Sequence, residues 1–152
     1  MHHTKTKADI GLASVIFDLT KKGYVPCIPL SEHQPYDVVA ISDKGKALKL
    51  QVKYSSLKKN GTIEVRFRTS WADKNGTHIR KYLESAFDYY AIYCPEKETV
   101  LYVPNRTNCP KAIRFDAPAN HQSEAIKWAN NYKELSGGSS ETIRRTPEMV
   151  KT

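Results

Sequence analysis

The sequence predicts a mixed α/β (α+β) domain in which a central mixed β-sheet is flanked by helices. A helical pattern opens the chain, several short strand patterns follow it, and a second helical pattern closes the folded part. The chain has 152 residues, which suits one domain with one core. We therefore expect a single domain over residues 1–135. A flexible tail over residues 136–152 should follow, because it begins with Ser-Gly-Gly-Ser-Ser.

The first predicted element is a helix over residues 7–22. Ile10, Ala13 and Phe17 recur at helical spacing, and Lys21 with Lys22 precedes a glycine, which is a common way for a helix to end. Residues 24–30 follow as a short strand. This strand contains two prolines, so we expect it at an edge of the sheet.

Three further strands are predicted over residues 37–42, 47–54 and 62–69. The first is β-branched and apolar, and the other two alternate between apolar and polar side chains. Turn-forming residues lie at 43–46 and at Asn60-Gly61. These patterns predict strands joined as hairpins.

The second half of the domain is less regular. Residues 70–82 are polar and aromatic without a clear period, which predicts a functional loop. Residues 87–94 and 99–103 are predicted to pair as strands, and residues 123–135 to form a helix. The tyrosine-rich strand pair and the last helix are our predicted subunit interface.

Positive charge is concentrated in one part of the chain. Residues 44–81 contain eleven Lys/Arg and two acids, a net charge of +9 in a chain whose total is +8. A basic block within a structured segment indicates a nucleic-acid surface. A solvated charged face gives the same composition and stays open as the alternative.

Other compositional signals point to a cytoplasmic protein that does not span a membrane. No apolar run reaches the roughly 18 residues that cross a bilayer, and the first residues lack the apolar stretch of a secretory signal. Cys27, Cys94 and Cys109 are odd in number and widely spaced. We expect them to be reduced thiols rather than a disulfide framework or a zinc site.

One carboxylate and one Gln-x-Lys pair lie on neighbouring predicted strands. Gln51 and Lys53 share a strand face, and hairpin pairing would bring that face alongside Asp37. Asp37, the Gln51 side-chain oxygen and the Val52 carbonyl oxygen are suitable ligands for Mg²⁺, and Lys53 could orient or deprotonate a water molecule. This combination is suited to phosphodiester hydrolysis. An ordinary surface strand has the same local pattern, so spacing alone leaves both interpretations open.

Several segments resemble the PD-(D/E)XK nuclease superfamily, and more closely its group I intron-encoded homing endonucleases of the cyanobacterial type. The resemblance covers roughly residues 5–103 and depends on Asp9-Ile10-Gly11, Pro29-Leu30-Ser31-Glu32-His33, Pro35-Tyr36-Asp37, Gln51-Val52-Lys53-Tyr54 and Arg68-Thr69-Ser70-Trp71-Ala72-Asp73-Lys74-Asn75-Gly76.

The resemblance implies a restriction-endonuclease-like core and assigns catalytic positions to Asp37, Gln51 and Lys53. It implies Mg²⁺ as the cofactor, with Mn²⁺ as a substitute. Gln51 stands where the superfamily usually has an acid, so weaker metal binding is expected. The superfamily often has a first-helix Glu near position 12, where this chain has Leu12. Asp9 is a candidate substitute, and a role in complementing the helix dipole is equally open for it.

Basic and amide side chains that suit DNA contacts cluster around the predicted loop and the strand before it. Arg and Asn can contact base edges, and Lys and Arg can hold phosphates. The predicted DNA-binding residues are Lys58, Lys59, Arg66, Arg68, Lys74, Asn75, His78, Arg80 and Lys81.

We thus predict a site-specific double-strand DNA endonuclease of the homing type. One active site per subunit implies a homo-oligomer, either a dimer or a dimer of dimers, and a near-palindromic target. Two alternatives remain, namely a structure-selective nuclease like a Holliday-junction resolvase and a non-catalytic DNA-binding module.

Overall fold

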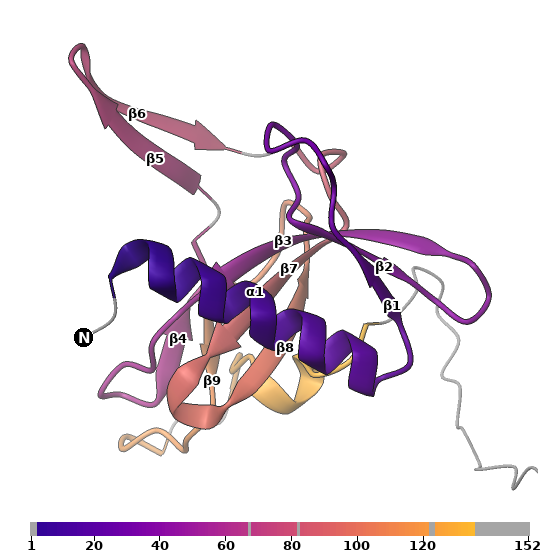
Figure 1. Cartoon of the computed structure of the whole chain (residues 1–152). Helices are drawn as coiled ribbons and strands as arrows, with labels where there is room; N and C mark the ends of the chain where they lie inside the picture. Colours follow the sequence, from indigo (N-terminus) through magenta and orange to yellow (C-terminus); the bar gives the residue numbers. More distant parts are fainter. Residues whose placement is uncertain (1–2, 67, 82, 122–123, 136–152) are drawn as a thin grey trace, which may run out of the picture.

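The computed structural model describes residues 3–66, 68–81, 83–121 and 124–135 (Figure 1). The predicted tail, residues 136–152, lies outside this part. The elements in chain order are α1 (Thr4–Lys21), β1 (Val25–Cys27), β2 (Val38–Ile41), β3 (Ala47–Tyr54), β4 (Thr62–Glu64), β5 (Arg68–Asp73), β6 (Gly76–Lys81), β7 (Tyr89–Cys94), the 3₁₀ turn η1 (Pro95–Lys97), β8 (Thr99–Pro104), β9 (Ala112–Arg114) and the 3₁₀ turn η2 (Ala129–Tyr132).

A five-stranded mixed sheet forms the centre of the molecule, with strand order β1-β2-β3-β7-β8. β3 and β7 are parallel, and the other neighbouring pairs are antiparallel. The predicted fold class is confirmed. Pro26 explains the place of β1 at the sheet edge, since proline lacks a backbone donor.

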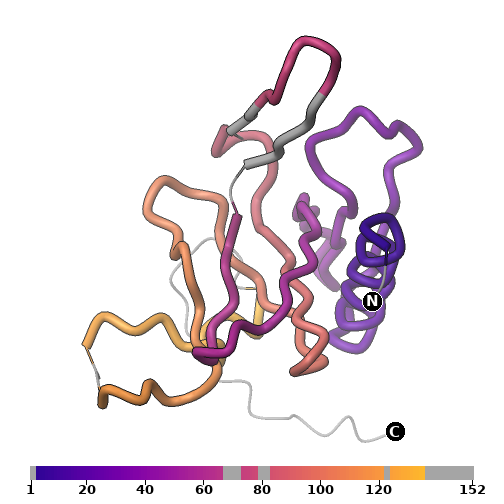
Figure 2. Tube along the Cα trace, turned by 90° about the vertical axis from the view of Figure 1, so that its left-hand side faces the viewer, coloured from indigo at the N-terminus to yellow at the C-terminus, as the bar shows by residue number. Residues whose placement is uncertain are grey.

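Helix α1 covers one face of this sheet (Figure 2). Gly11, Val15 and Leu19 are buried at four-residue spacing, which places them on one side of the helix. A Cβ atom added at Gly11 would lie 3.6 Å from Val52 Cγ1 and 3.8 Å from the Lys53 carbonyl oxygen. Helix α1 therefore crosses β3 closely at Gly11, next to the strand segment that bears the predicted site.

The opposite sheet face is covered by β4, β9 and η2, and α1 is the one α-helix among the residues that the structure describes (Figure 2). β4 pairs antiparallel with β9, and a second apolar cluster fills the space beneath them. Ile63 and Ile113 are fully buried there, together with Phe87, Tyr90, Ile92 and Leu101 of the central part. Burying such side chains stabilises the fold by about 1.5–3 kcal/mol each.

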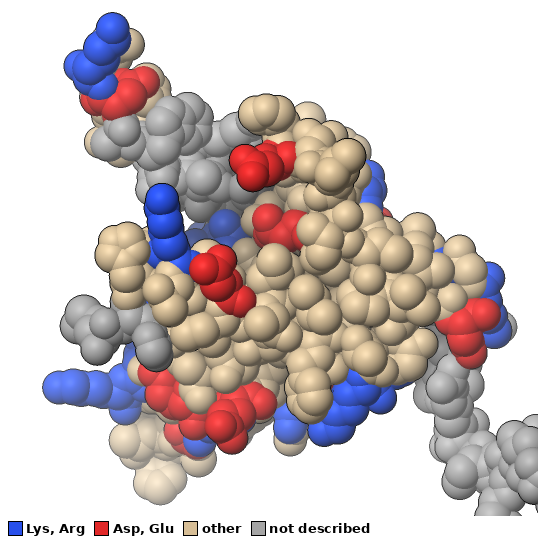
Figure 3. Space-filling model, in the orientation of Figure 1, with Lys and Arg blue, Asp and Glu red and all other residues tan. Residues whose placement is uncertain are grey.

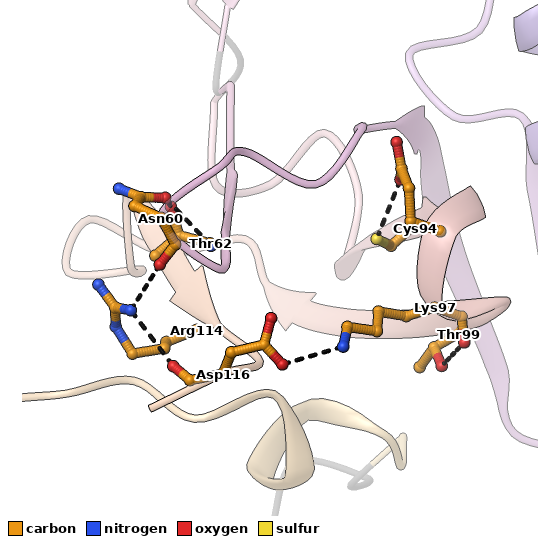
Figure 4. Close-up of polar contacts among 8 residues, drawn as sticks. Asn60, Thr62, Cys94, Lys97, Thr99, Arg114 and Asp116 are labelled. Carbon is orange, nitrogen blue, oxygen red and sulfur yellow. Dashed lines mark hydrogen bonds and ion pairs between the residues drawn. The ribbon is translucent and has the colours of Figure 1, made fainter. Parts of the chain in front are cut away.

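Polar contacts tie the turn before β4 to the body of the protein (Figure 4). Arg114 Nη1 donates a hydrogen bond to the Asn60 carbonyl oxygen at 2.7 Å, and Lys97 Nζ pairs with Asp116 Oδ1 at 2.9 Å. Gly61 has φ +78°, a conformation that favours glycine. The Arg114 contact holds the turn before β4 against β9, and the pair of Lys97 with Asp116 ties the residues after β9 to η1.

Two predictions about residues 62–82 were wrong. The expected strand over residues 62–69 is divided into β4 and the start of β5, because β4 pairs with β9 instead of forming a hairpin with β3. The expected loop over residues 70–82 is the β5–β6 hairpin, closed by a turn at Lys74 and Asn75. It projects from the body of the molecule (Figure 1). Its strands pair with each other in a separate two-stranded sheet.

The predicted helix over residues 123–135 was also wrong. Trp128 forms a β-bridge with Arg114, and the Arg114 N–H donates to the Lys127 carbonyl oxygen at 2.8 Å. This pairing with β9 holds the segment extended, so that only η2 is helical among its described residues. Two tyrosines of the predicted interface strands are buried within the chain, since Tyr90 and Tyr102 are each only 1% exposed, whereas β8 is an edge strand of the sheet. The subunit interface stays a prediction. Within the described residues, no helix is long and apolar enough to cross a bilayer.

Candidate active site

The site is formed where β2 begins beside the middle of β3. The Asp37 N–H donates to the Leu50 carbonyl oxygen at 2.9 Å, and Val38 pairs with Leu50 in the β2–β3 register. Asp37 is therefore opposite Gln51 on the neighbouring strand. Gln51 Nε2 donates to Asp37 Oδ2 at 2.7 Å. The predicted hairpin geometry is thus present, and it brings the acid and the amide into contact.

The backbone of Val52 faces the same carboxylate. Its N–H donates to Asp37 Oδ2 at 2.7 Å. The N–H and C=O of one strand residue point to the same side, so the Val52 carbonyl is directed to the side of Asp37. Both hydrogen bonds converge on Oδ2, and within the described residues none is formed by Oδ1. One carboxylate oxygen therefore remains for another partner.

Lys53 interacts electrostatically with Asp37, and both side chains are half-buried. Burial raises the pKa of the Asp37 carboxyl, while the hydrogen bond from Val52 and the charge of Lys53 act in the opposite direction. Burial also lowers the pKa of the Lys53 ammonium, and Asp37 partly offsets this. The environment thus favours a lysine that gives up its proton more easily than an exposed one.

Comparisons with known proteins decide the family. The model of the PD-(D/E)XK endonuclease family matches residues 2–135. The chain belongs to the PD-(D/E)XK endonuclease family. A solved structure described as that of a bacterial homing endonuclease, I-Ssp6803I, is similar, with a TM-score of 0.71 and 25% sequence identity over 87% of this chain and 89% of that chain. The comparison with curated proteins gave no match. The resemblance stated from the sequence segments is therefore confirmed.

The donor atoms of this PD-(D/E)XK endonuclease are compatible with a hard divalent cation. Among the residues that the structure describes, no three His, Cys, Asp or Glu side chains gather into a metal site. A cation at Asp37 would therefore depend on neutral oxygen donors, namely the Gln51 amide and the Val52 carbonyl, which Mg²⁺ accepts. In the structure the amide nitrogen of Gln51 faces Asp37. Rotation of the amide group about its last torsion angle brings the oxygen to that side.

Asp9 is not brought into this cluster. Its side chain is exposed, and it lies two residues from the sheet-facing Gly11, which is a rotation of about 200° around the helix. Asp9 therefore lies on the side of α1 away from β3. Its predicted catalytic role stays a prediction without support from this geometry.

The predicted DNA-binding residues fall into two groups. Lys58, Lys59 and Arg66 flank β4, whereas the others belong to the β5–β6 hairpin. Lys74 and Asn75 are exposed at the hairpin tip, and His78 Nε2 lies 3.1 Å from Asp73 Oδ1. The side chains of Arg68, Arg80 and Lys81 lie outside the described part of the structure, so only their strand positions are assigned.

The charges are unevenly distributed over the surface. The face over α1, β1 and β2 has few Lys or Arg residues at its centre, whereas basic side chains lie along its rim and at the hairpin tip, where an acid lies beside them (Figure 3). Lys7 and Glu64 were not predicted as neighbours of Lys53, although they line one cleft with it. No sequence signal marks Lys7, because its position depends on where α1 crosses β3.

Proposed function

We propose that this endonuclease is a site-specific, double-strand DNA endonuclease that uses Mg²⁺, with Mn²⁺ as a substitute, and that it serves intron homing. The main observation behind this proposal is the contact between Asp37 and Gln51 beside Lys53, within a chain that matches the family over residues 2–135. The similarity to the structure of a bacterial homing endonuclease supports the homing role.

The residues of the site have distinct roles in the proposed reaction. When bound, the divalent cation would polarise the scissile phosphate and stabilise its developing negative charge. Asp37 holds the cation, with the Gln51 and Val52 oxygens as further ligands. Lys53 orients the attacking water and accepts its proton, which its lowered pKa favours. Asp37 in turn keeps the Lys53 side chain in place through their charge interaction.

The β5–β6 hairpin is the proposed recognition element. A two-stranded ribbon has dimensions that the DNA major groove accepts. Lys74 and Asn75 are exposed at its tip and provide an ammonium group and an amide for phosphate and base contacts. The Asn75 N–H donates to Asp73 Oδ1 at 2.7 Å, so the turn that presents these side chains is fixed by its own acid.

The proposal includes a homo-oligomer, either a dimer or a dimer of dimers, acting on a near-palindromic target. Each chain contributes one such site, and cutting two antiparallel strands requires two sites related by a two-fold axis. We also propose a cytoplasmic location, which is supported by the free thiols of Cys27, Cys94 and Cys109.

The decisive experiment measures DNA cleavage with Mg²⁺, with Mn²⁺ and with EDTA, using a plasmid library that contains randomised inserts. We expect metal-dependent double-strand cuts at one enriched sequence. Asp37→Ala and Lys53→Ala should abolish cleavage while binding and melting curves stay near wild type. A four-way junction serves as a further substrate. Preferential cutting of that junction would support a resolvase-like enzyme, and binding without any nicking would support a non-catalytic module.

A further inference from the structure

A cleft with a volume of about 370 Å³ lies beside Lys53 at the end of β3. The described residues that line it include four cations, two serines and one carboxylate, namely Lys7, Lys53, Lys58, Arg66, Ser55, Ser56 and Glu64. Lys53 belongs both to this cleft and to the catalytic cluster. The cleft therefore adjoins the catalytic cluster at Lys53, although Asp37 and Gln51 do not line it.

Three separate segments bring the cations to the cleft. Lys7 comes from α1, where its Nζ lies 5.8 Å from the centroid of the Tyr54 ring. Lys58 lies in a turn before β4, in which its N–H donates to the Thr62 carbonyl oxygen at 2.8 Å. Arg66 follows β4 and precedes the recognition hairpin. The cations thus converge through the tertiary fold.

Glu64 pairs with two of these cations. Its Oε2 lies 3.4 Å from Lys58 Nζ and 3.5 Å from Arg66 Nη2. Lys58, chiefly through its hydrogen bond, lowers the pKa of the Glu64 carboxyl. The three side chains remain between 45% and 80% exposed, so these pairs are weak and exchangeable. A carboxylate between two cations resembles, in charge and in oxygen acceptors, a DNA phosphate bound in the same place.

We propose that this cleft binds a backbone phosphate of the cleaved DNA strand, next to the scissile phosphate at Asp37 and Lys53, and that the phosphate displaces Glu64 from Lys58 and Arg66. The inference rests on the proposed endonuclease function. Lys7 adds charge from the α1 side, and the Ser56 hydroxyl can supply a donor. The Ser55 hydroxyl donates to the Glu64 carbonyl oxygen at 3.0 Å and so helps to fix the position of this residue in the cleft. The cleft would guide the strand from the hairpin base, where Arg66 lies, to the catalytic lysine.

The test is the salt dependence of binding to a fluorescein-labelled 30-base-pair duplex of mixed sequence, measured by anisotropy in EDTA so that no cleavage occurs. Lys7→Gln and Lys58→Gln should each reduce the slope of log K against log salt concentration by about 0.9, and reduce affinity roughly tenfold at low salt. Glu64→Gln should increase affinity, because it removes a competing charge. Lys44→Gln is the matched control, since Lys44 is exposed in the turn at the opposite end of β2 and β3.

Each result bears on one proposal only. If Lys7→Gln and Lys58→Gln have the same slope as Lys44→Gln, the cleft does not hold a phosphate, even when the wild type cuts DNA. Unchanged or reduced affinity in Glu64→Gln would overturn the exchange of carboxylate for phosphate. The wild type could instead fail to cut DNA with Mg²⁺ or Mn²⁺ while Lys7→Gln and Lys58→Gln still reduce the slope. That result would refute the endonuclease function but support phosphate binding in the cleft. Melting curves check that every variant is folded.

Discussion

Asp37 and Gln51 face each other across β2 and β3, and one carboxylate oxygen, Oδ2, accepts hydrogen bonds from both Gln51 Nε2 and the Val52 N–H at 2.7 Å. These neutral donors hold the half-buried carboxylate in place without adding another acid. The site therefore concentrates its negative charge on Asp37, beside the ammonium of Lys53. Charge balance at this single acid underlies the first three predictions.

Asp37→Asn should stabilise the metal-free protein at neutral pH. Burial raises the pKa of Asp37 above its ordinary value of 3.8, so ionisation of this residue opposes folding. The folded state favours the protonated form of Asp37. This stability is complete below the unfolded-state pKa of the carboxyl and is lost as pH rises through its folded-state pKa. We expect Asp37→Asn to raise Tm at about pH 8, and the gain to disappear at about pH 3. Asp9→Asn, an exposed acid on α1, is the control, and an equal gain there would contradict the assignment.

Lys53→Arg should show whether Lys53 acts by accepting a proton from water or only through its positive charge. Arginine keeps the positive charge but does not give up its proton in proteins. We expect DNA binding in EDTA to be retained and the cleavage rate to fall by about 10²-fold or more, which is the usual contribution of a general base. Lys49→Arg on the same strand is the matched control and should cut normally. Wild-type cleavage rates in Lys53→Arg would show that charge alone is sufficient.

Gln51→Glu should make the protein more responsive to metal and less stable without it. A second carboxylate beside Asp37 adds repulsion in EDTA, which should lower Tm, and adds a charged ligand when a divalent cation is present. We expect affinity for Mn²⁺ to increase at least tenfold, about 1.4 kcal/mol, as measured by thermal shift titration. Gln51→Leu is the companion variant and should weaken the response. Identical titrations of wild type and Gln51→Glu would argue against a ligand role.

Gly61→Ala should destabilise the fold more than an equivalent change elsewhere. Gly61 has φ +78°, and an added Cβ would lie 2.8 Å from Asp116 Cβ. Gly45→Ala is the control, because Gly45 has φ +81° but nothing within 4 Å of the added atom. Both variants should lose about 1 kcal/mol from backbone strain, and Gly61→Ala roughly 1–2 kcal/mol more. Urea denaturation measures the difference, and equal losses would mean that the 58–62 turn relaxes freely.

Asp73→Ala should reduce sequence discrimination without unfolding the protein. Asp73 Oδ1 accepts from the Asn75 N–H and pairs with His78, and all three residues lie at the hairpin tip. Loss of the acid should loosen the turn and reduce the ratio of target to random-sequence affinity. Global stability should change by less than about 0.5 kcal/mol, because the hairpin projects from the body. The ratio is measured on the enriched target sequence, and an unchanged ratio would exclude a role for this turn in recognition.

Local patterns in the sequence were sufficient to predict the first helix, the β7–β8 pair and the pairing of β2 with β3. The contact between Asp37 and Gln51 follows from this pairing, because one turn and the two-residue period of a strand decide which side chains meet. The basic segment was also visible in the sequence alone, since charge can be counted without coordinates.

Tertiary structure alone decided the partner of β4, the extended path near Trp128 and the presence of Lys7 in the cleft. Each depends on contacts between segments far apart in the chain. The hairpin at residues 68–81 is a local pairing, but its sequence has no clear strand period and therefore did not reveal it. The apolar spacing near residues 125–132 satisfies a helix, yet pairing of Lys127 and Trp128 with β9 holds that part extended, and Ala129–Tyr132 form only a 3₁₀ turn. Local periodicity describes which face of an element is apolar, but it does not specify which distant strand or helix covers that face.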